Sequence, residues 1–264
     1  MNMKITGKTK LYGIVGHPIE NVKSPELFNQ HFLNNGIDAA MMPLDVELDD
    51  IESFWYGLKK IKNLEGLIVT MPHKKTIVPF LDELSQNSKI TRSVNVVKKI
   101  NEKWTGEMFD GEGCVRALHT HGVKIKNRKI GLVGIGGAGE AVMVALAFAG
   151  CSEITISDLD SSKINVALTQ MQKNFPGIRV SQLNDDFRDV DIFINCTAIG
   201  MNDEDDTVIN VNDLPSHAVV FDVITKETPL VAKAKLIGLK AFNGISMHRE
   251  QAKLAINYLN LPEL

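Results

Sequence analysis

The chain has 264 residues, enough for one large domain or two domains of ordinary size. Hydrophobic residues make up 44% and charged residues 23%, the balance of a soluble globular protein with a sizeable core. The formal net charge of −3 and the scattered lysines and arginines give no basis for a nucleic-acid or anionic-membrane partner. The longest apolar run, residues 141–149, is less than half of a membrane span.

The cysteines are few and far apart. Cys114, Cys151 and Cys196 form no CxxC pair, and no pair of histidines has the spacing of a metal site. The first residues of the chain contain no apolar segment of the kind that targets secretion. These features predict a reducing, cytoplasmic location and no bound metal.

Strands and helices alternate through the N-terminal part of the chain. Ser24 followed by Pro25 fits the N-cap and first position of a helix that ends before Gly36. Further helices are expected after Asp49 or Asp50 and after Lys74. Strands are expected at residues 11–15, 39–46, 66–70, 94–100 and 103–108, the last two joined by a tight turn at 101–102. This alternation predicts a mostly parallel α/β sheet.

A second alternating series follows. Its helices are expected at residues 110–121, 140–148, 161–174, 230–237 and 246–259, and its strands at 130–133, 153–157, 191–195, 219–222 and 239–242. The acidic run at residues 203–206 is interpreted as a solvated loop. Two α/β units in one chain predict a crevice between them, where small-molecule sites usually lie.

The strand at residues 130–133 runs directly into a glycine-rich turn and then into a helix. Gly134, Gly136 and Gly139 have the spacing of a dinucleotide fingerprint, in which the glycines allow a tight turn, close approach of a pyrophosphate, and close packing of helix on strand. The next strand ends at Asp158, where an acid that binds ribose belongs. The predicted dinucleotide-binding residues are Gly134, Gly136, Gly137, Ala138, Gly139 and Asp158. A glycine turn with a purely structural role is the alternative.

Short motifs along the chain agree with one family. They are Gly16-His17-Pro18, Lys23-Ser24-Pro25, Val69-Thr70-Met71-Pro72-His73-Lys74, Ser93-Val94-Asn95, Gly106 with Asp110-Gly111, the glycine turn, Asn195-Cys196-Thr197, Thr228-Pro229, and Gly244 with Met247 and Gln251. In this order they resemble the motifs of the shikimate dehydrogenase family. The resemblance extends from Tyr12 to about Tyr258.

The resemblance implies a two-domain α/β fold. Residues 1–105 would form a mostly parallel substrate-binding domain, completed by the C-terminal helix at 245–264, and residues 106–244 a Rossmann dinucleotide-binding domain. It also implies hydride transfer between NAD or NADP and a ring hydroxyl or ketone of shikimate or a similar cyclic hydroxy acid. Such an enzyme, a monomer or a homodimer, would serve aromatic amino acid biosynthesis.

The resemblance assigns roles to single residues. Lys74 and Asp110 would be catalytic, because a proton must leave the hydroxyl oxygen as the hydride leaves carbon. The implied substrate ligands are Ser24, Thr70, Asn95 and Gln251, and further cofactor ligands are Asn195, Thr197, Gly244 and Met247. Taken alone, Lys74 would be a solvated charge, and Ser24 and Asp110 plain helix caps.

Several positions depart from the family pattern. Val22 replaces a serine that would bind the substrate carboxylate, and Ile68, Met108 and Phe109 replace polar residues. We therefore expect a more apolar substrate shell. Asp158 stands where many members have an arginine that meets the 2′-phosphate of NADP, which predicts NAD as the preferred cofactor, with NADP possible.

Three alternatives remain open from the sequence. The first is a quinate-type dehydrogenase, which would act on quinate in place of shikimate. A catalytically silent nucleotide-binding sensor of the same fold would not need Lys74 and Asp110. A methylene-tetrahydrofolate dehydrogenase would place a tyrosine four residues before its active lysine, where this chain has Thr70.

Overall fold

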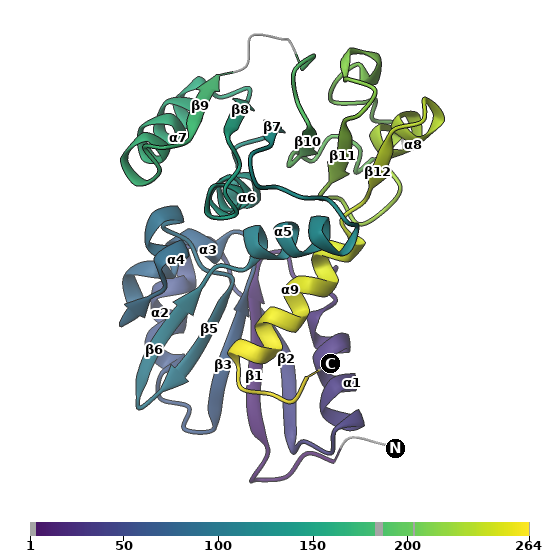
Figure 1. Cartoon of the computed structure of the whole chain (residues 1–264). Coiled ribbons are helices and arrows are strands. Elements are labelled where there is room, and N and C mark those ends of the chain that lie inside the picture. Colours follow the sequence, from purple (N-terminus) through teal and green to yellow (C-terminus); the bar gives the residue numbers. More distant parts are fainter. Residues whose placement is uncertain (1–3, 183–186, 203, 264) are drawn as a thin grey trace. The chain divides into compact units, whose positions relative to one another are not determined.

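The computed structural model describes residues 4–182, 187–202 and 204–263, and the chain divides into two compact units (Figure 1). Unit 1 contains Met1–Phe109 and Lys253–Leu264, and unit 2 contains Asp110–Ala252. Each unit is built on a six-stranded sheet, so the predicted α/β fold class is confirmed. No helix in the described ranges is long and apolar enough to cross a membrane.

Unit 1 has a mixed sheet in the order β2-β1-β3-β5-β6-β4. β1 pairs in parallel with β2 and β3, whereas β5 is antiparallel to both of its neighbours. The turn between β5 and β6 has positive φ at Asn101 and Glu102, as the predicted two-residue hairpin requires. The elements of unit 1 before the last helix are β1 (Lys10–Gly16), α1 (Ser24–Asn34), β2 (Ala39–Asp45), α2 (Ile51–Leu58), β3 (Leu64–Val69), α3 (His73–Thr76), β4 (Glu83–Leu84), α4 (Gln86–Thr91), β5 (Val96–Ile100) and β6 (Lys103–Glu107).

Two apolar cores stabilise unit 1. One contains Trp55 of α2 and Trp104 of β6, whose rings meet edge to face with centroids 5.2 Å apart. The other contains Tyr12 and Phe32 together with Leu254 and other residues from the end of α9 (Ile245–Tyr258). The C-terminal half of α9 therefore belongs to unit 1, although the helix begins in unit 2.

Unit 2 has an all-parallel sheet in the order β12-β11-β10-β7-β8-β9. Its elements are α5 (Asp110–Thr120), β7 (Lys129–Val133), α6 (Gly137–Phe148), β8 (Glu153–Ser157), α7 (Ser161–Asn174), β9 (Arg179–Gln182), β10 (Ile192–Asn195), β11 (Val219–Asp222), α8 (Pro229–Leu236), β12 (Lys240–Phe242) and the first part of α9. From β7 the following strands, β8 and β9, are added on one side of the sheet, and from β10 the strands β11 and β12 are added on the other side. In such doubly wound sheets, ligands bind outside the carboxyl ends of the strands at this switch point.

Close helix packing explains why α6 is apolar on nearly every side. A Cβ on Gly111 of α5 would lie 2.0 Å from the carbonyl oxygen of Ala141, so α5 and α6 touch through their backbones. The other side of α6 packs on β7, whose Ile130 and Leu132 are fully buried.

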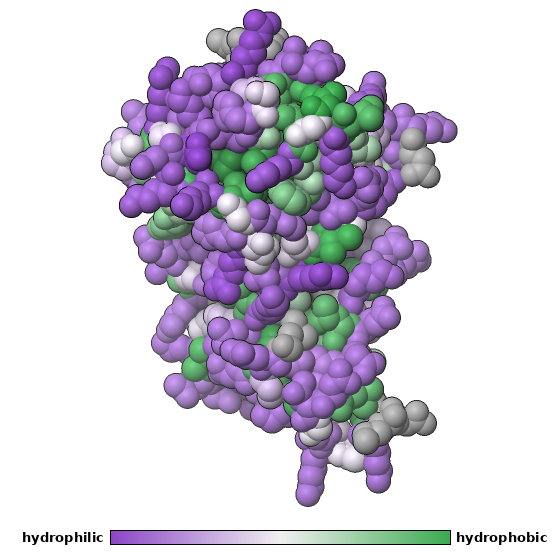
Figure 2. Space-filling model, turned by 45° about the vertical axis from the view of Figure 1, so that its right-hand side comes forward, coloured by the Kyte–Doolittle hydropathy of each residue, from purple (hydrophilic) through white to green (hydrophobic). Residues whose placement is uncertain are grey.

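Figure 2 shows that hydrophilic residues cover most of one face of the molecule, with apolar side chains in smaller patches.

Some elements differ from those expected. Strands β4 and β9 and helix α4 were not expected, because each is short and none has a clear apolar pattern. Helix α1 has Lys23 at its N-cap, and Ser24 is its first residue, without a capping hydrogen bond. The alternative that Ser24 is a plain N-cap is therefore wrong.

Candidate active site

The turn between β7 and α6 contains glycines of two kinds. Gly134 has a φ of +90°, which favours glycine, and a Cβ on Gly139 would lie 1.8 Å from the carbonyl oxygen of Gly134. Both are thus required by the protein itself. Gly136 has a φ of −80°, and a Cβ there would meet no atom within 4 Å. The turn leaves open space at Gly136, which fits the close approach of a pyrophosphate.

Asp158 follows β8 and joins it to the glycine turn. Its Oδ2 accepts the N–H of Ile135 at 2.6 Å, and its Oδ1 accepts the N–H of Asp160 at 2.9 Å. Lys163 Nζ lies 4.0 Å from Oδ1. The cap of α7 is Asp160, which accepts the N–H of Ser162, so Asp158 is not the cap of that helix. A carboxylate has further lone pairs, so these contacts leave Asp158 able to accept from a ribose hydroxyl.

A turn after β10 forms another wall. Asn195 is fully buried, and its Oδ1 accepts the N–H of Thr197 at 3.0 Å and its hydroxyl at 2.7 Å. Its Nδ2 donates to the carbonyl oxygen of Ile199 at 3.1 Å. Asn195 therefore stabilises the turn through its buried hydrogen bonds. Thr197, unlike Asn195, lines the cavity that this turn helps to form.

These segments enclose a cavity of about 840 Å³ at the carboxyl ends of β7, β8 and β10. Four predicted cofactor residues line it, namely Gly134, Gly136, Asp158 and Thr197. The other lining residues are Val133, Ser157, Leu159, Asp160, Lys163, Cys196, Ala198, Ile199, Asn202, Asp205 and Val208. Gly137, Ala138 and Gly139 form the first turn of α6. The open glycine turn, the helix N-terminus and the acid at the ribose position fit a dinucleotide.

Asp205 was missed by the sequence prediction. Its Oδ2 accepts the N–H groups of Gly200 at 2.9 Å and Asn202 at 3.0 Å. Both hydrogen bonds lower the pKa of Asp205, the one from Asn202 more strongly than the one from Gly200. The prediction of a merely solvated acidic loop is therefore wrong for Asp205, which lines the cavity. Asp206 fits the prediction better, because it pairs with Lys233 at the surface. Asp203 lies outside the described residues.

In unit 1, three predicted residues gather at one edge of the sheet. Thr70 follows β3 and donates its N–H to the carbonyl oxygen of Val15, and the carbonyl oxygen of Lys74 accepts the N–H of Val94 at 2.8 Å. Asn95 precedes β5, and its Oδ1 accepts the N–H of Phe109 at 2.8 Å. These hydrogen bonds place Thr70, partly buried Lys74 and Asn95 near the carboxyl end of β3. Ser24 begins α1, after the loop that follows β1.

In unit 2, Asp110 begins α5 and is buried. Gln251 Nε2 donates to Asp110 Oδ1 at 3.3 Å. A Cβ on Gly113 would lie 2.5 Å from Gln251 Cγ, so glycine lets α5 and the first part of α9 approach closely. Gln251 thus contacts the predicted catalytic carboxylate, a contact that the sequence did not indicate.

Gly244 and Met247, like Asn195 and residues 137–139, are predicted cofactor residues that do not line the cavity. A Cβ on Gly244 would lie 2.0 Å from the carbonyl oxygen of Val223, which gives this glycine a structural reason. Met247 is buried. Their roles toward the cofactor stay predictions.

The departures from the family pattern fall in different environments. Met108 and Phe109 are buried, and Phe109 meets the ring of Tyr258 edge to face with centroids 5.6 Å apart. Ile68 packs against the same core. Phe109 and Ile68 therefore contribute to the core of unit 1, whereas Val22, two residues before Ser24, is not part of that core.

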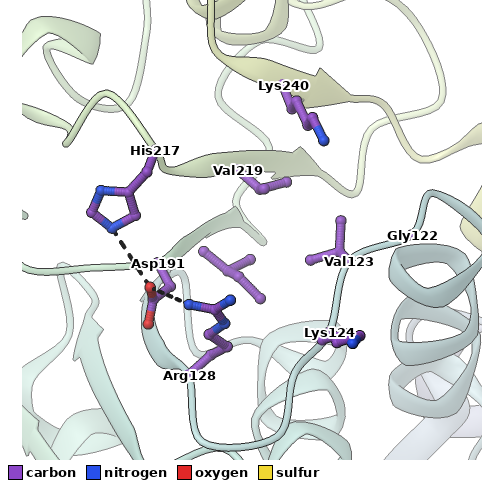
Figure 3. Close-up of a pocket in the computed structure, with 9 residues that line it drawn as sticks. Gly122, Val123, Lys124, Arg128, Asp191, His217, Val219 and Lys240 are labelled. Carbon is purple, nitrogen blue, oxygen red and sulfur yellow. Dashed lines mark hydrogen bonds and ion pairs between the residues drawn. The ribbon is translucent and has the colours of Figure 1, made fainter.

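A smaller cavity of about 250 Å³ lies at the amino ends of the unit 2 strands (Figure 3). Its acidic residue, Asp191, is 3.0 Å from Arg128 Nη1 and 3.5 Å from His217 Nε2, and accepts the N–H of Lys129. None of the predicted site residues lines this cavity.

Comparison with known proteins gives a consistent result. The model of the shikimate dehydrogenase substrate binding domain matches residues 14–97. The NADP(+) shikimate dehydrogenase of Alkaliphilus metalliredigens is 32% identical, over 97% of this chain and 93% of that protein. The NADP(+) shikimate dehydrogenase of Methanococcus maripaludis is 34% identical, over 92% of this chain and 88% of that protein. The crystal structure of Listeria monocytogenes shikimate 5-dehydrogenase with shikimate and NAD is 26% identical, with a TM-score of 0.93 over 100% of this chain and 96% of that one. The predicted resemblance is confirmed: the chain belongs to the shikimate dehydrogenase family and is an NAD(P)-dependent oxidoreductase of that type.

Proposed function

We propose that the protein transfers a hydride between NAD and a ring hydroxyl or ketone of shikimate or a shikimate-like cyclic hydroxy acid. The observation that carries this proposal is the cavity at the carboxyl edge of unit 2, open at Gly136 and lined by Asp158. When bound, the nicotinamide supplies or accepts the hydride. In this proposal residues 106–244 bind the dinucleotide, and residues 1–105 with 245–264 bind the substrate. The match of residues 14–97 to a substrate binding domain supports the second assignment, and the Listeria enzyme was crystallised with both shikimate and NAD.

Lys74 and Asp110 are the proposed catalytic pair. As the alcohol is oxidised, its oxygen loses a proton, and a positioned base accelerates that step by about 10²–10⁴-fold. A lysine can also stabilise negative charge that develops on the oxygen. Gln251 donates to Asp110 Oδ1 and so helps to orient this carboxylate.

Ser24, Thr70, Asn95 and Gln251 are the proposed substrate ligands. Their hydroxyl and amide groups can donate to a carboxylate and exchange hydrogen bonds with ring hydroxyls. The position of Thr70 and Asn95 near Lys74 supports this role. The cofactor is assigned to the glycine turn and Asp158, to Asn195 and Thr197, and to Gly244 and Met247.

NAD is proposed as the preferred cofactor. Among the lining residues that the structure describes, Asp158, Asp160 and Asp205 are acidic, whereas Lys163 is basic. Hydrogen bonds from Ser162 lower the pKa of Asp160, so this group is ionised at neutral pH, as is Asp205. At about 5 Å and an effective dielectric constant near 20, the carboxylate of Asp158 would repel a phosphate charge by about 3 kcal/mol. The relatives from Alkaliphilus metalliredigens and Methanococcus maripaludis are named as NADP(+) enzymes, so the proposed preference of this chain for NAD depends on Asp158.

A reducing, cytoplasmic setting completes the proposal, with the protein a monomer or homodimer. Its described cysteines are free, and burial raises the pKa of Cys114 and Cys151 to about 12. Such thiols are poor nucleophiles at neutral pH, so no role in the reaction is assigned to them.

The catalytic assignment is tested by formation of reduced nicotinamide from shikimate and NAD. We expect turnover by the wild-type chain and, in Lys74→Ala, a kcat lower by about 10²–10⁴-fold with a much smaller change in KM. Lys75→Ala, which changes the exposed neighbour on the same short helix, is the matched control and should keep wild-type kcat. Turnover that survives Lys74→Ala would remove Lys74 from the mechanism. No turnover with any substrate would favour the silent sensor.

The substrate is tested by comparing shikimate with quinate in the wild type and in Val22→Ser. A hydrogen bond to a charged group contributes about 1.5–3 kcal/mol, or roughly tenfold to a hundredfold in kcat/KM. We expect the serine to increase kcat/KM for shikimate by this order. Efficient wild-type use of shikimate without improvement by serine would show that Val22 does not limit it. Better use of quinate would identify a quinate-type enzyme.

A further inference from the structure

A buried acid connects the ends of two neighbouring strands in unit 2. Asp222, the last residue of β11, is fully buried, and β11 pairs with β10. Its Oδ1 accepts the N–H of Ile224 at 3.0 Å, and its Oδ2 accepts the hydroxyl of Thr228 at 2.7 Å. The same Oδ2 accepts Nδ2–H of Asn195 at 3.2 Å. Asp222 does not line the cofactor cavity, so it can affect that cavity only through a neighbour.

Asn195 is that neighbour. Its Oδ1 accepts both the N–H and the hydroxyl of Thr197, and its Nδ2 also donates to the carbonyl oxygen of Ile199. The hydroxyl oxygen of Thr197 in turn accepts the N–H of Ile199 at 3.1 Å. One buried amide therefore holds the turn together, and Thr197, Ala198 and Ile199 of this turn line the cavity.

The orientation of the Asn195 amide depends on the acid. An amide has a donor end and an acceptor end, whereas an ionised carboxylate only accepts. Asp222 therefore orients the Asn195 amide so that its Nδ2 points to the carboxylate and its Oδ1 points to Thr197. Burial raises the pKa of Asp222, and the hydrogen bonds from Ile224, Thr228 and Asn195 oppose that shift by favouring the ionised form.

We propose that Asp222 is a positioning residue for dinucleotide binding, because it fixes the orientation of the Asn195 amide and, through it, the turn that forms one wall of the cavity. The proposal rests on the proposed function for the identity of the ligand. It assigns no contact between Asp222 and the cofactor.

Asp222→Asn tests this orientation. The new amide can still accept from Ile224 with its oxygen, but its nitrogen then faces the donor end of Asn195. If Asn195 turns over, its donor end faces the N–H of Thr197, and the turn loses a hydrogen bond. We expect amide hydrogen exchange at Thr197 to accelerate about tenfold in the cofactor-free chain, and NADH to bind about tenfold more weakly.

Thr228→Val is the control. It removes another hydrogen bond to the same carboxylate, together with the cap of α8, so it lowers the midpoint of thermal unfolding as a merely structural change would. It leaves the bond between Asn195 and Asp222 in place. We therefore expect wild-type exchange at Thr197 and a wild-type Kd for NADH.

The two readouts separate the possible failures. Wild-type exchange at Thr197 in Asp222→Asn, or equal acceleration in Thr228→Val, would overturn the positioning role. If the wild-type chain bound neither NADH nor NADPH, the proposed function would fall, whereas the exchange measurement in the cofactor-free chain would still decide whether Asp222 holds the turn.

Discussion

The sheet of unit 2 has a cavity at each edge, and the acids of the two edges have different partners. At the amino edge, Asp191 lies within ion-pair distance of Arg128 and His217 (Figure 3). At the carboxyl edge, Asp158 accepts two backbone N–H groups, and Lys163 Nζ lies 4.0 Å from its Oδ1. The acid at the amino edge therefore has a cation, Arg128, at hydrogen-bond distance, whereas the acid at the carboxyl edge is held mainly by backbone N–H groups.

This difference separates an acid that ties strands together from an acid that can select a ligand. Asp191 also accepts the N–H of Lys129, so it joins the segment before β10 to the start of β7. The guanidinium group of Arg128, 3.0 Å away, balances its charge. Asp158 holds the glycine turn with neutral donors, and its charge remains to repel phosphate or to accept from ribose.

The largest effect is expected at the glycine turn. Gly139→Ala places a Cβ 1.8 Å from a backbone oxygen, which should lower the free energy of unfolding by about 3 kcal/mol or more. Gly136→Ala meets no atom within 4 Å, so it should change that free energy by less than about 1 kcal/mol but still weaken NADH binding. Thermal unfolding and NADH titration of both variants check this. Wild-type NADH binding by Gly136→Ala would contradict a phosphate site at this turn.

The next effect concerns cofactor choice. Asp158→Arg should shift the ratio of kcat/KM for NAD over NADP toward NADP by about tenfold or more, since it replaces a repelling charge with an attracting one. Lys163→Gln is the companion variant. It should reduce the use of NADP slightly and leave that of NAD nearly unchanged, because Lys163 lies beside the same carboxylate. A ratio that does not respond to Asp158→Arg would show that Asp158 does not face the ribose.

The smallest effect is expected at the amino edge. Asp191→Asn keeps an acceptor for the N–H of Lys129 but removes the charge paired with half-exposed Arg128 and exposed His217. Because exposed ion pairs are weak, we expect a loss of about 1 kcal/mol in the free energy of unfolding. The Kd for NADH should not change. A change in the Kd for NADH would contradict the claim that only the carboxyl edge of the sheet takes part in cofactor binding.

Much of the site could be predicted from the sequence because its signals are local. The glycine turn, the strand Glu153–Ser157 and Asp158 follow one another along the chain, and Gly139 packs on the carbonyl group of Gly134, five positions away. The hairpin at Asn101 and Glu102 is local as well. Strand β9 (Arg179–Gln182) gave no such signal, because it is a short edge strand without fully buried residues.

The remaining features depend on contacts between distant parts of the chain. Asp222, Asn195 and Thr228 form one hydrogen-bonded group only after β10 and β11 have paired. The contact of Gln251 with Asp110 requires the close approach of two helices at Gly113. Asp205 lies in an acidic run that is typical of a solvated loop, and only the folding of its turn onto Gly200 brings it to the cavity.

The central claim is that the carboxyl edge of unit 2 binds a nicotinamide dinucleotide and that its acids favour NAD. Its most direct test is titration of the wild-type chain with NADH and with NADPH under identical salt conditions. We predict saturable binding of both at one site, with a lower Kd for NADH by about tenfold. A lower Kd for NADPH would contradict the role given to Asp158, and binding of neither would contradict the site itself.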